Sequence, residues 1–82
     1  MIKNEQERQR IGARITELRR VVEWTDGLGI HRTGMTQTEL ARRAGIRQSN
    51  LSRIERGAYA ATIDILATIV DAMGYEIDFV TK

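Results

Sequence analysis

The sequence predicts a small, mainly α-helical domain of four to five helices that ends in a β-strand. Along residues 11–22 and 63–73, apolar residues recur at a spacing of three to four, as on one face of a helix. Glycines at 45, 57 and 74 follow such stretches, and glycine ends helices because it adopts a left-handed turn at little cost. Over residues 75–79, apolar and acidic side chains alternate with the period of two that is typical of a strand.

Length and composition limit the kind of protein. The chain has 82 residues, so we expect residues 1–82 to form a single domain. It contains no cysteine and one histidine, His31, so we expect no disulfide, no metal and no cofactor. No apolar run has the length of a membrane span, and the first residues lack the apolar stretch of a signal peptide. We therefore expect a cytoplasmic protein without a membrane partner.

The local signals define each helix. The apolar stripe predicts a long first helix that ends near Trp24, and three glycines mark residues 25–35 as a connecting loop. Thr36 and Glu39 have the spacing of a capping box, which predicts a second helix over residues 37–44. A third helix is expected over about 48–56, and Thr62 is placed to cap a fourth.

The positive charge is concentrated in the middle of the chain. Residues 31–57 carry six arginines against two glutamates, whereas residues 58–82 carry one lysine against four acids. A local basic excess is expected where phosphates are neutralised, although a solvated arginine-rich helix face has the same composition. The exposed face of the third helix carries glutamine, serine and arginine, which are groups that hydrogen-bond to base edges in the major groove. This composition favours DNA binding.

Residues 35–57, MTQTELARRAGIRQSNLSRIERG, resemble the helix-turn-helix of the Cro/Xre (lambda-repressor-like) proteins. The resemblance continues more weakly through TIDILATIVDAMG. It implies a lambda-repressor-like fold with a DNA-binding core at about 36–57. It also implies a transcriptional regulator that has double-stranded DNA as its partner and acts at a bacterial or phage nucleoid.

The resemblance further implies roles for individual residues. Gln48, Ser49 and Arg53 would contact bases. A second set would lie at the DNA backbone or the groove edge, namely Gln37, Arg43, Arg47, Asn50, Ser52 and Arg56. Glu55 matches a family position that pairs with an arginine of the first helix, for which Arg19 is the candidate, so this pair would be structural. No residue is expected to be catalytic, because the one imidazole lies in a different segment from the serines of the third helix.

The sequence departs from the family pattern in three places. Arg19 and Gln37 are 18 positions apart, considerably more than the family usually has. Arg47 stands where the third helix usually has a serine or threonine cap. The family's last helix is replaced by the predicted strand. For the long connection at 25–35, we expect a surface loop that packs Leu28 and Ile30 onto the core. The alternative is a β-wing, or a loop that reaches the flanking groove through His31 and Arg32.

A strand at about 75–81 needs a partner for its backbone hydrogen bonds. We expect it to pair with the same strand of a second copy and to bury Tyr75, Ile77 and Phe79, although pairing within the chain is the alternative. Such a homodimer would hold two recognition helices about one DNA turn apart and repress by binding a pseudo-palindromic operator. A similar exchange of helix for strand occurs in antitoxins of the family. An antitoxin that regulates its own operon and binds a toxin is therefore a second hypothesis. The third is a protein-interaction module that does not bind DNA.

Overall fold

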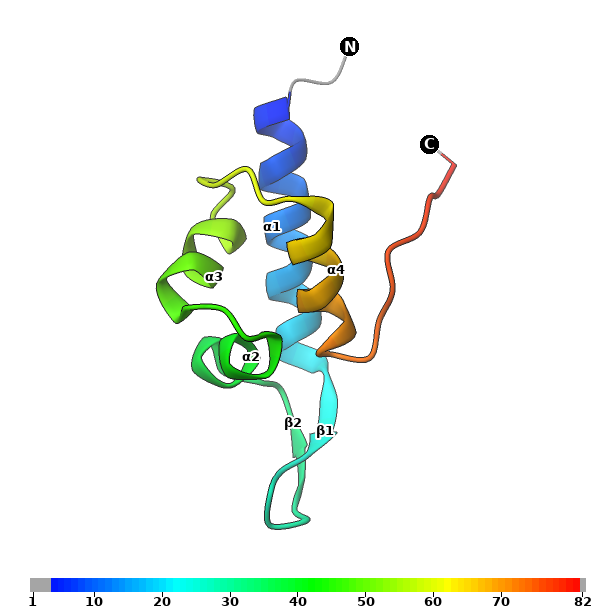
Figure 1. Ribbon diagram of the computed structural model, residues 1–82. Helices are drawn as coiled ribbons and strands as arrows, with labels where there is room; N and C mark the ends of the chain where they lie inside the picture. Colours follow the sequence, from blue (N-terminus) through cyan, green and yellow to red (C-terminus); the bar gives the residue numbers. More distant parts are fainter. Residues whose placement is uncertain (1–3, 82) are drawn as a thin grey trace.

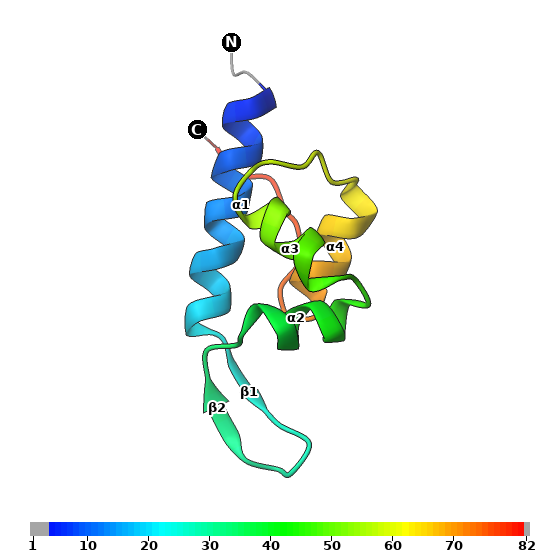
Figure 2. The same cartoon turned by 90° about the vertical axis from the view of Figure 1, so that its left-hand side faces the viewer.

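The computed structural model describes residues 4–81 and places four helices and one two-stranded sheet within them (Figure 1). Figure 2 shows the three shorter helices gathered on one side of the first, with the sheet projecting from its far end. The elements are α1 (Asn4–Val21), β1 (Glu23–Thr25), β2 (His31–Thr33), α2 (Gln37–Ala44), α3 (Gln48–Glu55) and α4 (Ile63–Asp71). The predicted, mainly helical fold class is confirmed. None of the helices in this part of the chain is both long and apolar enough to cross a lipid bilayer.

The core lies where the four helices meet. Leu40 of α2, Leu51 of α3 and Ile69 of α4 are fully enclosed, and Ile15 of α1 packs into the same cluster. Burying an aliphatic side chain of this size stabilises the fold by roughly 1.5–3 kcal/mol. These contacts fix α3 against both α1 and α2, so its opposite face is left for solvent.

The ends of α2 follow the predicted signals. The hydroxyl of Thr36 accepts a hydrogen bond from the backbone N–H of Glu39 at 3.0 Å, and Gly45 closes the helix with a φ of 71°. The carboxylate of Glu39 turns to Arg42 and Arg43 instead of reaching back to the cap, so the expected capping box is half formed. At the start of α3, Arg47 provides no side-chain cap.

The connection between α1 and α2 is a β-hairpin and not the expected loop. β1 and β2 pair antiparallel, with Trp24 opposite Arg32. At the tip, Asp26 Oδ1 accepts hydrogen bonds from the backbone N–H groups of Leu28 and Ile30, both at 2.9 Å. Asp26 Oδ2 accepts from Arg32 Nε at 2.7 Å. The bonds from Ile30 and Arg32 lower the pKa of Asp26, so the tip is held by an ionised carboxylate.

The expectation that Leu28 and Ile30 pack onto the core is wrong. They are 85% and 50% exposed. The reason is that the hairpin extends away from the helices (Figure 2). The alternative of a β-wing describes the form of this segment correctly.

The strand expected at about 75–81 is not present in the single chain. Residues 75–81 carry no strand, and the tail runs on the side of α4 away from α3 (Figure 1). The physical reason is the lack of a partner, since β1 and β2 pair with each other at the far end of the molecule. Pairing within residues 4–81 is therefore not observed. Pairing between two copies stays a prediction.

Candidate nucleic-acid interface

The outward face of α3 is polar. Leu51 and Ile54 point into the core and are buried, while Gln48, Ser49 and Arg53 are exposed. The residues predicted for the edge of the interface surround them, with Asn50, Arg47 and Arg56 exposed and Ser52 half-buried. The structure thus brings the predicted base-contacting and edge residues of α3 together on one accessible surface.

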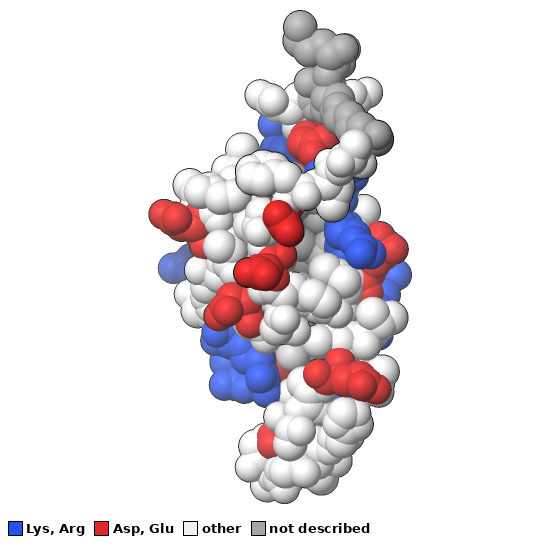
Figure 3. Space-filling model, turned by 90° about the vertical axis from the view of Figure 1, so that its right-hand side faces the viewer, with Lys and Arg blue, Asp and Glu red and all other residues white. Residues whose placement is uncertain are grey.

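Acidic side chains gather on another face. Figure 3 shows the side of the molecule that carries α4 and the tail, where several acidic groups are exposed. The acids of these segments are Asp64, Asp71, Glu76 and Asp78. By contrast, the one acid of α3, Glu55, is buried. A polyanion is therefore repelled from the α4 face and not from α3.

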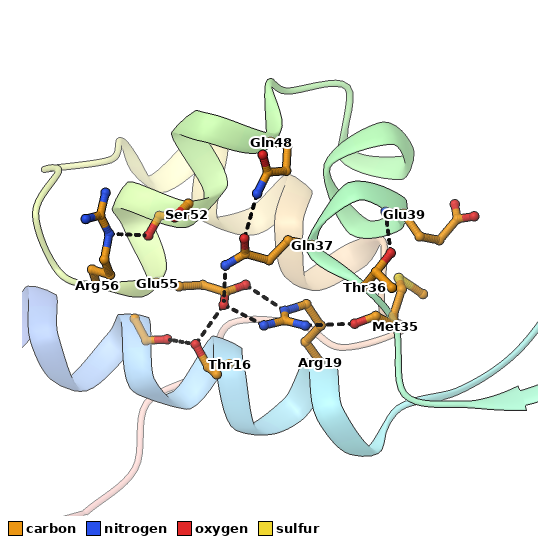
Figure 4. Close-up of polar contacts among 11 residues, drawn as sticks. Thr16, Arg19, Met35, Thr36, Gln37, Glu39, Gln48, Ser52, Glu55 and Arg56 are labelled. Atoms are coloured by element: carbon orange, nitrogen blue, oxygen red, sulfur yellow. Dashed lines mark hydrogen bonds and ion pairs between the residues drawn. The ribbon is translucent and has the colours of Figure 1, made fainter.

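A buried ion pair fixes α3 to α1. Arg19 Nε donates to Glu55 Oε2 at 2.8 Å, and Arg19 Nη2 donates to Glu55 Oε1 at 2.9 Å (Figure 4). The Thr16 hydroxyl also donates to Oε1 at 2.9 Å, and Arg19 Nη1 donates to the Met35 carbonyl at 2.9 Å. The side chains of Arg19 and Glu55 are 13% and 4% exposed. The structure thus brings together the two residues of the expected pair, despite the insertion between them.

The ionisation of Glu55 follows from its partners. Burial alone would raise the pKa of Glu55, but hydrogen bonds from Arg19, Gln37 and Thr16 outweigh it, and the pKa is lowered. The carboxylate is therefore charged at neutral pH and fully occupied inside the domain, as a structural group.

Gln37 connects this pair to the surface. Its Nε2 donates to Glu55 Oε1 at 3.1 Å, and its Oε1 accepts from Gln48 Nε2 at 2.7 Å (Figure 4). A chain of hydrogen bonds thus runs from the buried carboxylate to the first residue of α3. Gln37 was expected at a DNA phosphate, and its side-chain amide is engaged within the protein in this structure. This hydrogen bond favours one orientation of the Gln48 side chain.

The arginines of α2 are held by neighbours. Arg42 and Arg43 both bind the Glu39 carboxylate, the latter through Nε at 3.2 Å. The Arg43 guanidinium also lies 4.6 Å from the centre of the Trp24 ring and donates to the Thr25 carbonyl at 3.4 Å. Arg43, predicted at the DNA backbone, is thus tied to the hairpin.

Arg47 and Arg53 differ from the arginines of α2, because neither forms an ion pair with any acid in residues 4–81. Within the same residues, the side chain of Arg56 donates only to the Ser52 carbonyl, at 3.3 Å. Three arginines without an ion pair therefore lie on and beside α3, and Arg20 of α1 is likewise exposed and unpaired within residues 4–81.

Three contacts of this region were not predicted from the sequence. Thr16 donates a hydrogen bond to Glu55 of the buried pair, the Arg43 guanidinium lies over the Trp24 ring, and the Arg53 guanidinium lies over the Tyr59 ring. Thr16 lies three residues before Arg19 and so on the same helix face, which is a usable signal. For the two aromatic residues, nothing in the local sequence indicates which cation each would meet.

The comparison with known families agrees with this geometry. The family model for the helix-turn-helix matches residues 28–80, more than half of the chain, and covers β2, α2, α3, α4 and most of the tail. A search of curated proteins returned no match. The family match and the polar, acid-free surface of α3 agree on a DNA partner. The chain belongs to the Cro/C1-type helix-turn-helix family and is a DNA-binding transcription regulator.

Proposed function

We propose that this regulator is a repressor that binds a pseudo-palindromic operator as a homodimer, with α3 of each copy in the major groove. The observation that carries the proposal is the exposed polar face of α3. Its cations lack acidic partners in residues 4–81, and Gln48 is held in place by Gln37.

The readout would come from three side chains of α3. Glutamine pairs with adenine through two hydrogen bonds, arginine pairs with guanine in the same way, and serine accepts either. Gln48, Ser49 and Arg53 supply these groups on one exposed face. Arg47 and Arg56, together with Asn50 and Ser52, flank this set and would position the helix through phosphates and groove edges.

The dimer would be built on the tail. Tyr75, Ile77 and Phe79 are exposed and alternate with polar residues, and the backbone of 75–81 has no strand partner within residues 4–81. Pairing with a second tail would satisfy these groups and bury the three apolar side chains. A two-fold axis at this point requires a two-fold related operator.

The test is selection of bound sites from a random DNA pool, followed by affinity measurements over a range of salt concentrations. We expect a pseudo-palindromic site with half-sites about 10 base pairs apart. If Arg47 and Arg56 of each copy neutralise one phosphate each, the plot of log affinity against log salt has a slope of about −4.

Two variants test the face assignment. Gln48→Ala and Arg53→Ala should each relax preference at one half-site position and cost about 1–3 kcal/mol in binding. Arg14→Ala, an exposed arginine of α1, is the matched control and should leave the preference unchanged. Binding without salt dependence would contradict the DNA role, whereas wild-type preference in both variants would contradict the face assignment.

One observation favours the antitoxin as a second function. The hairpin tip exposes Leu28 and Ile30, and Arg32 of the hairpin is paired with Asp26, so the tip suits an apolar protein surface better than a phosphate. The test is to express the product of the adjacent gene with and without this chain. Growth arrest that this chain relieves would support an antitoxin, and growth that is unaffected by that product would contradict it.

A further inference from the structure

The guanidinium of Arg53 lies over an aromatic ring from outside α3. Its Cζ lies 5.3 Å from the ring centre of Tyr59, within the distance at which a cation is attracted by a ring face. Tyr59 belongs to the connection between α3 and α4, for which the sequence indicated no function.

This contact leaves the readout groups of Arg53 available. A contact with a ring face uses none of the five N–H groups in a conventional hydrogen bond, and the Arg53 guanidinium donates no hydrogen bond within residues 4–81. Arg42 and Arg43 are the contrast, since their N–H groups are bound by Glu39. Arg53 is therefore restricted in orientation and still free to donate.

The ring itself is held in a defined place. Gly57 adopts a φ of 72°, and a Cβ there would lie 2.7 Å from the Cα of Gln9, so the chain leaves α3 in close contact with α1. Ala58 N then donates to the Arg53 carbonyl at 2.9 Å. The Tyr59 ring lines a cleft with Ile54 and Leu66 and is about a third exposed. A ring anchored in this way can limit the motion of a long side chain.

We propose that Tyr59 is a positioning residue for base readout, whose ring holds the Arg53 guanidinium in the orientation that contacts the base. The inference rests on the proposed function, because it requires Arg53 to read a base. The role belongs to the aromatic ring and not to the hydroxyl. It lowers the conformational freedom that Arg53 loses on binding.

The experiment measures discrimination, the ratio of affinities for the selected operator and for operators changed at one position. Arg53→Ala first identifies the position that Arg53 reads. Tyr59→Leu should lower discrimination at that position about threefold to fivefold, as expected for loss of an exposed cation–π contact, and leave the other positions unchanged. Tyr59→Phe keeps the ring and should match the wild type. In the Arg53→Ala background, Tyr59→Leu should have no further effect.

Each other outcome overturns the inference. Equal losses in Tyr59→Phe and Tyr59→Leu would assign the effect to the hydroxyl. A Tyr59→Leu loss that is uniform over all operators would assign it to affinity or folding, and thermal denaturation of each variant separates these two causes. Wild-type discrimination in Tyr59→Leu would remove the role from Tyr59 while leaving the proposed function intact. A wild-type protein that selects no operator would refute the proposed function itself.

Discussion

The Glu55→Gln substitution tests how strongly the buried ion pair stabilises the domain. Glu55 Oε1 accepts from Arg19, Thr16 and Gln37, while Oε2 accepts from Arg19 Nε alone. A glutamine can keep the first oxygen, but it places an amide N–H against Arg19 Nε. The Arg19 guanidinium would then remain 13% exposed without an anion.

The expected loss is about 3 kcal/mol. Removing one partner of a buried ion pair costs roughly 3–5 kcal/mol, and the lower end applies because the amide retains one acceptor oxygen. For a domain of this size, 1 kcal/mol corresponds to about 4–8 °C in Tm, so the melting temperature should fall by roughly 12–24 °C. Gln37 keeps its acceptor, because the oxygen that the glutamine retains is Oε1.

The effect should depend on pH in a defined direction. The folded-state pKa of Glu55 is lowered, so its stabilisation is complete above the unfolded-state pKa of about 4.3. It is lost as the pH falls from there through the folded-state pKa. Glutamine does not titrate, and the difference between variant and wild type should therefore shrink on acidification.

The assay is urea unfolding followed by circular dichroism at pH 7 and at steps toward pH 3. Glu17→Gln is the matched control, because Glu17 is 67% exposed and lies 3.7 Å from Arg14, so its loss should cost under about 0.5 kcal/mol. A Glu55→Gln loss below about 1 kcal/mol at pH 7 would refute the reasoning, and so would a difference that stays constant with pH.

Two further predictions concern packing and assembly. A Cβ on Gly12 would lie 2.4 Å from the Ile54 carbonyl oxygen and 2.6 Å from that of Glu55. Gly12→Ala should therefore destabilise the domain by about 2 kcal/mol, although alanine is the better helix former. A variant as stable as the wild type in urea unfolding would show that α1 can move away from α3. Phe79 is 96% exposed, so Phe79→Ser should preserve the fold but shift sedimentation toward monomers. Val80→Ser is the control and should leave sedimentation unchanged, because residue 80 points to the other side of an extended tail. An unchanged dimer in Phe79→Ser would contradict pairing of the tails.

The helices of the reading unit could be predicted because their signals are local. Thr36 and Gly45 mark both ends of α2, and the observed helix, Gln37–Ala44, has the predicted bounds. The Arg19–Glu55 pair was accessible only through the family resemblance, since 36 positions separate its members and no periodicity relates them. Its partner Thr16 could have been proposed from its place three residues before Arg19 on the same helix face, once that pair was assumed.

The hairpin was not the expected form of residues 25–35, and the tail forms no strand within the single chain, because strands depend on partners. β1 and β2 have three residues each, too short for an apolar alternation, and the Asp26 side chain stabilises their turn. In the tail, the alternation from Tyr75 to Phe79 is a genuine period of two. A period of two, however, describes only which side chains share a face, and the hydrogen bonds of a strand come from a second segment.

The hairpin contacts α2, which lies beside the candidate interface, and does not itself present an unpaired cation to it. Arg32 is bound to Asp26, and His31 lies 3.7 Å from Glu23, so the hairpin offers a phosphate no uncompensated cation. Trp24 of the hairpin instead donates to the Gly34 carbonyl at 2.8 Å and carries the Arg43 guanidinium on its ring. The insertion thereby contacts α2 just before its start, through Gly34, and in its last turn, through Arg43, while Gln37 at the start of α2 binds Gln48. We therefore expect the hairpin to support the reading helix without itself lying on the DNA, and expect the arginines on and beside α3 to supply the charge at the groove.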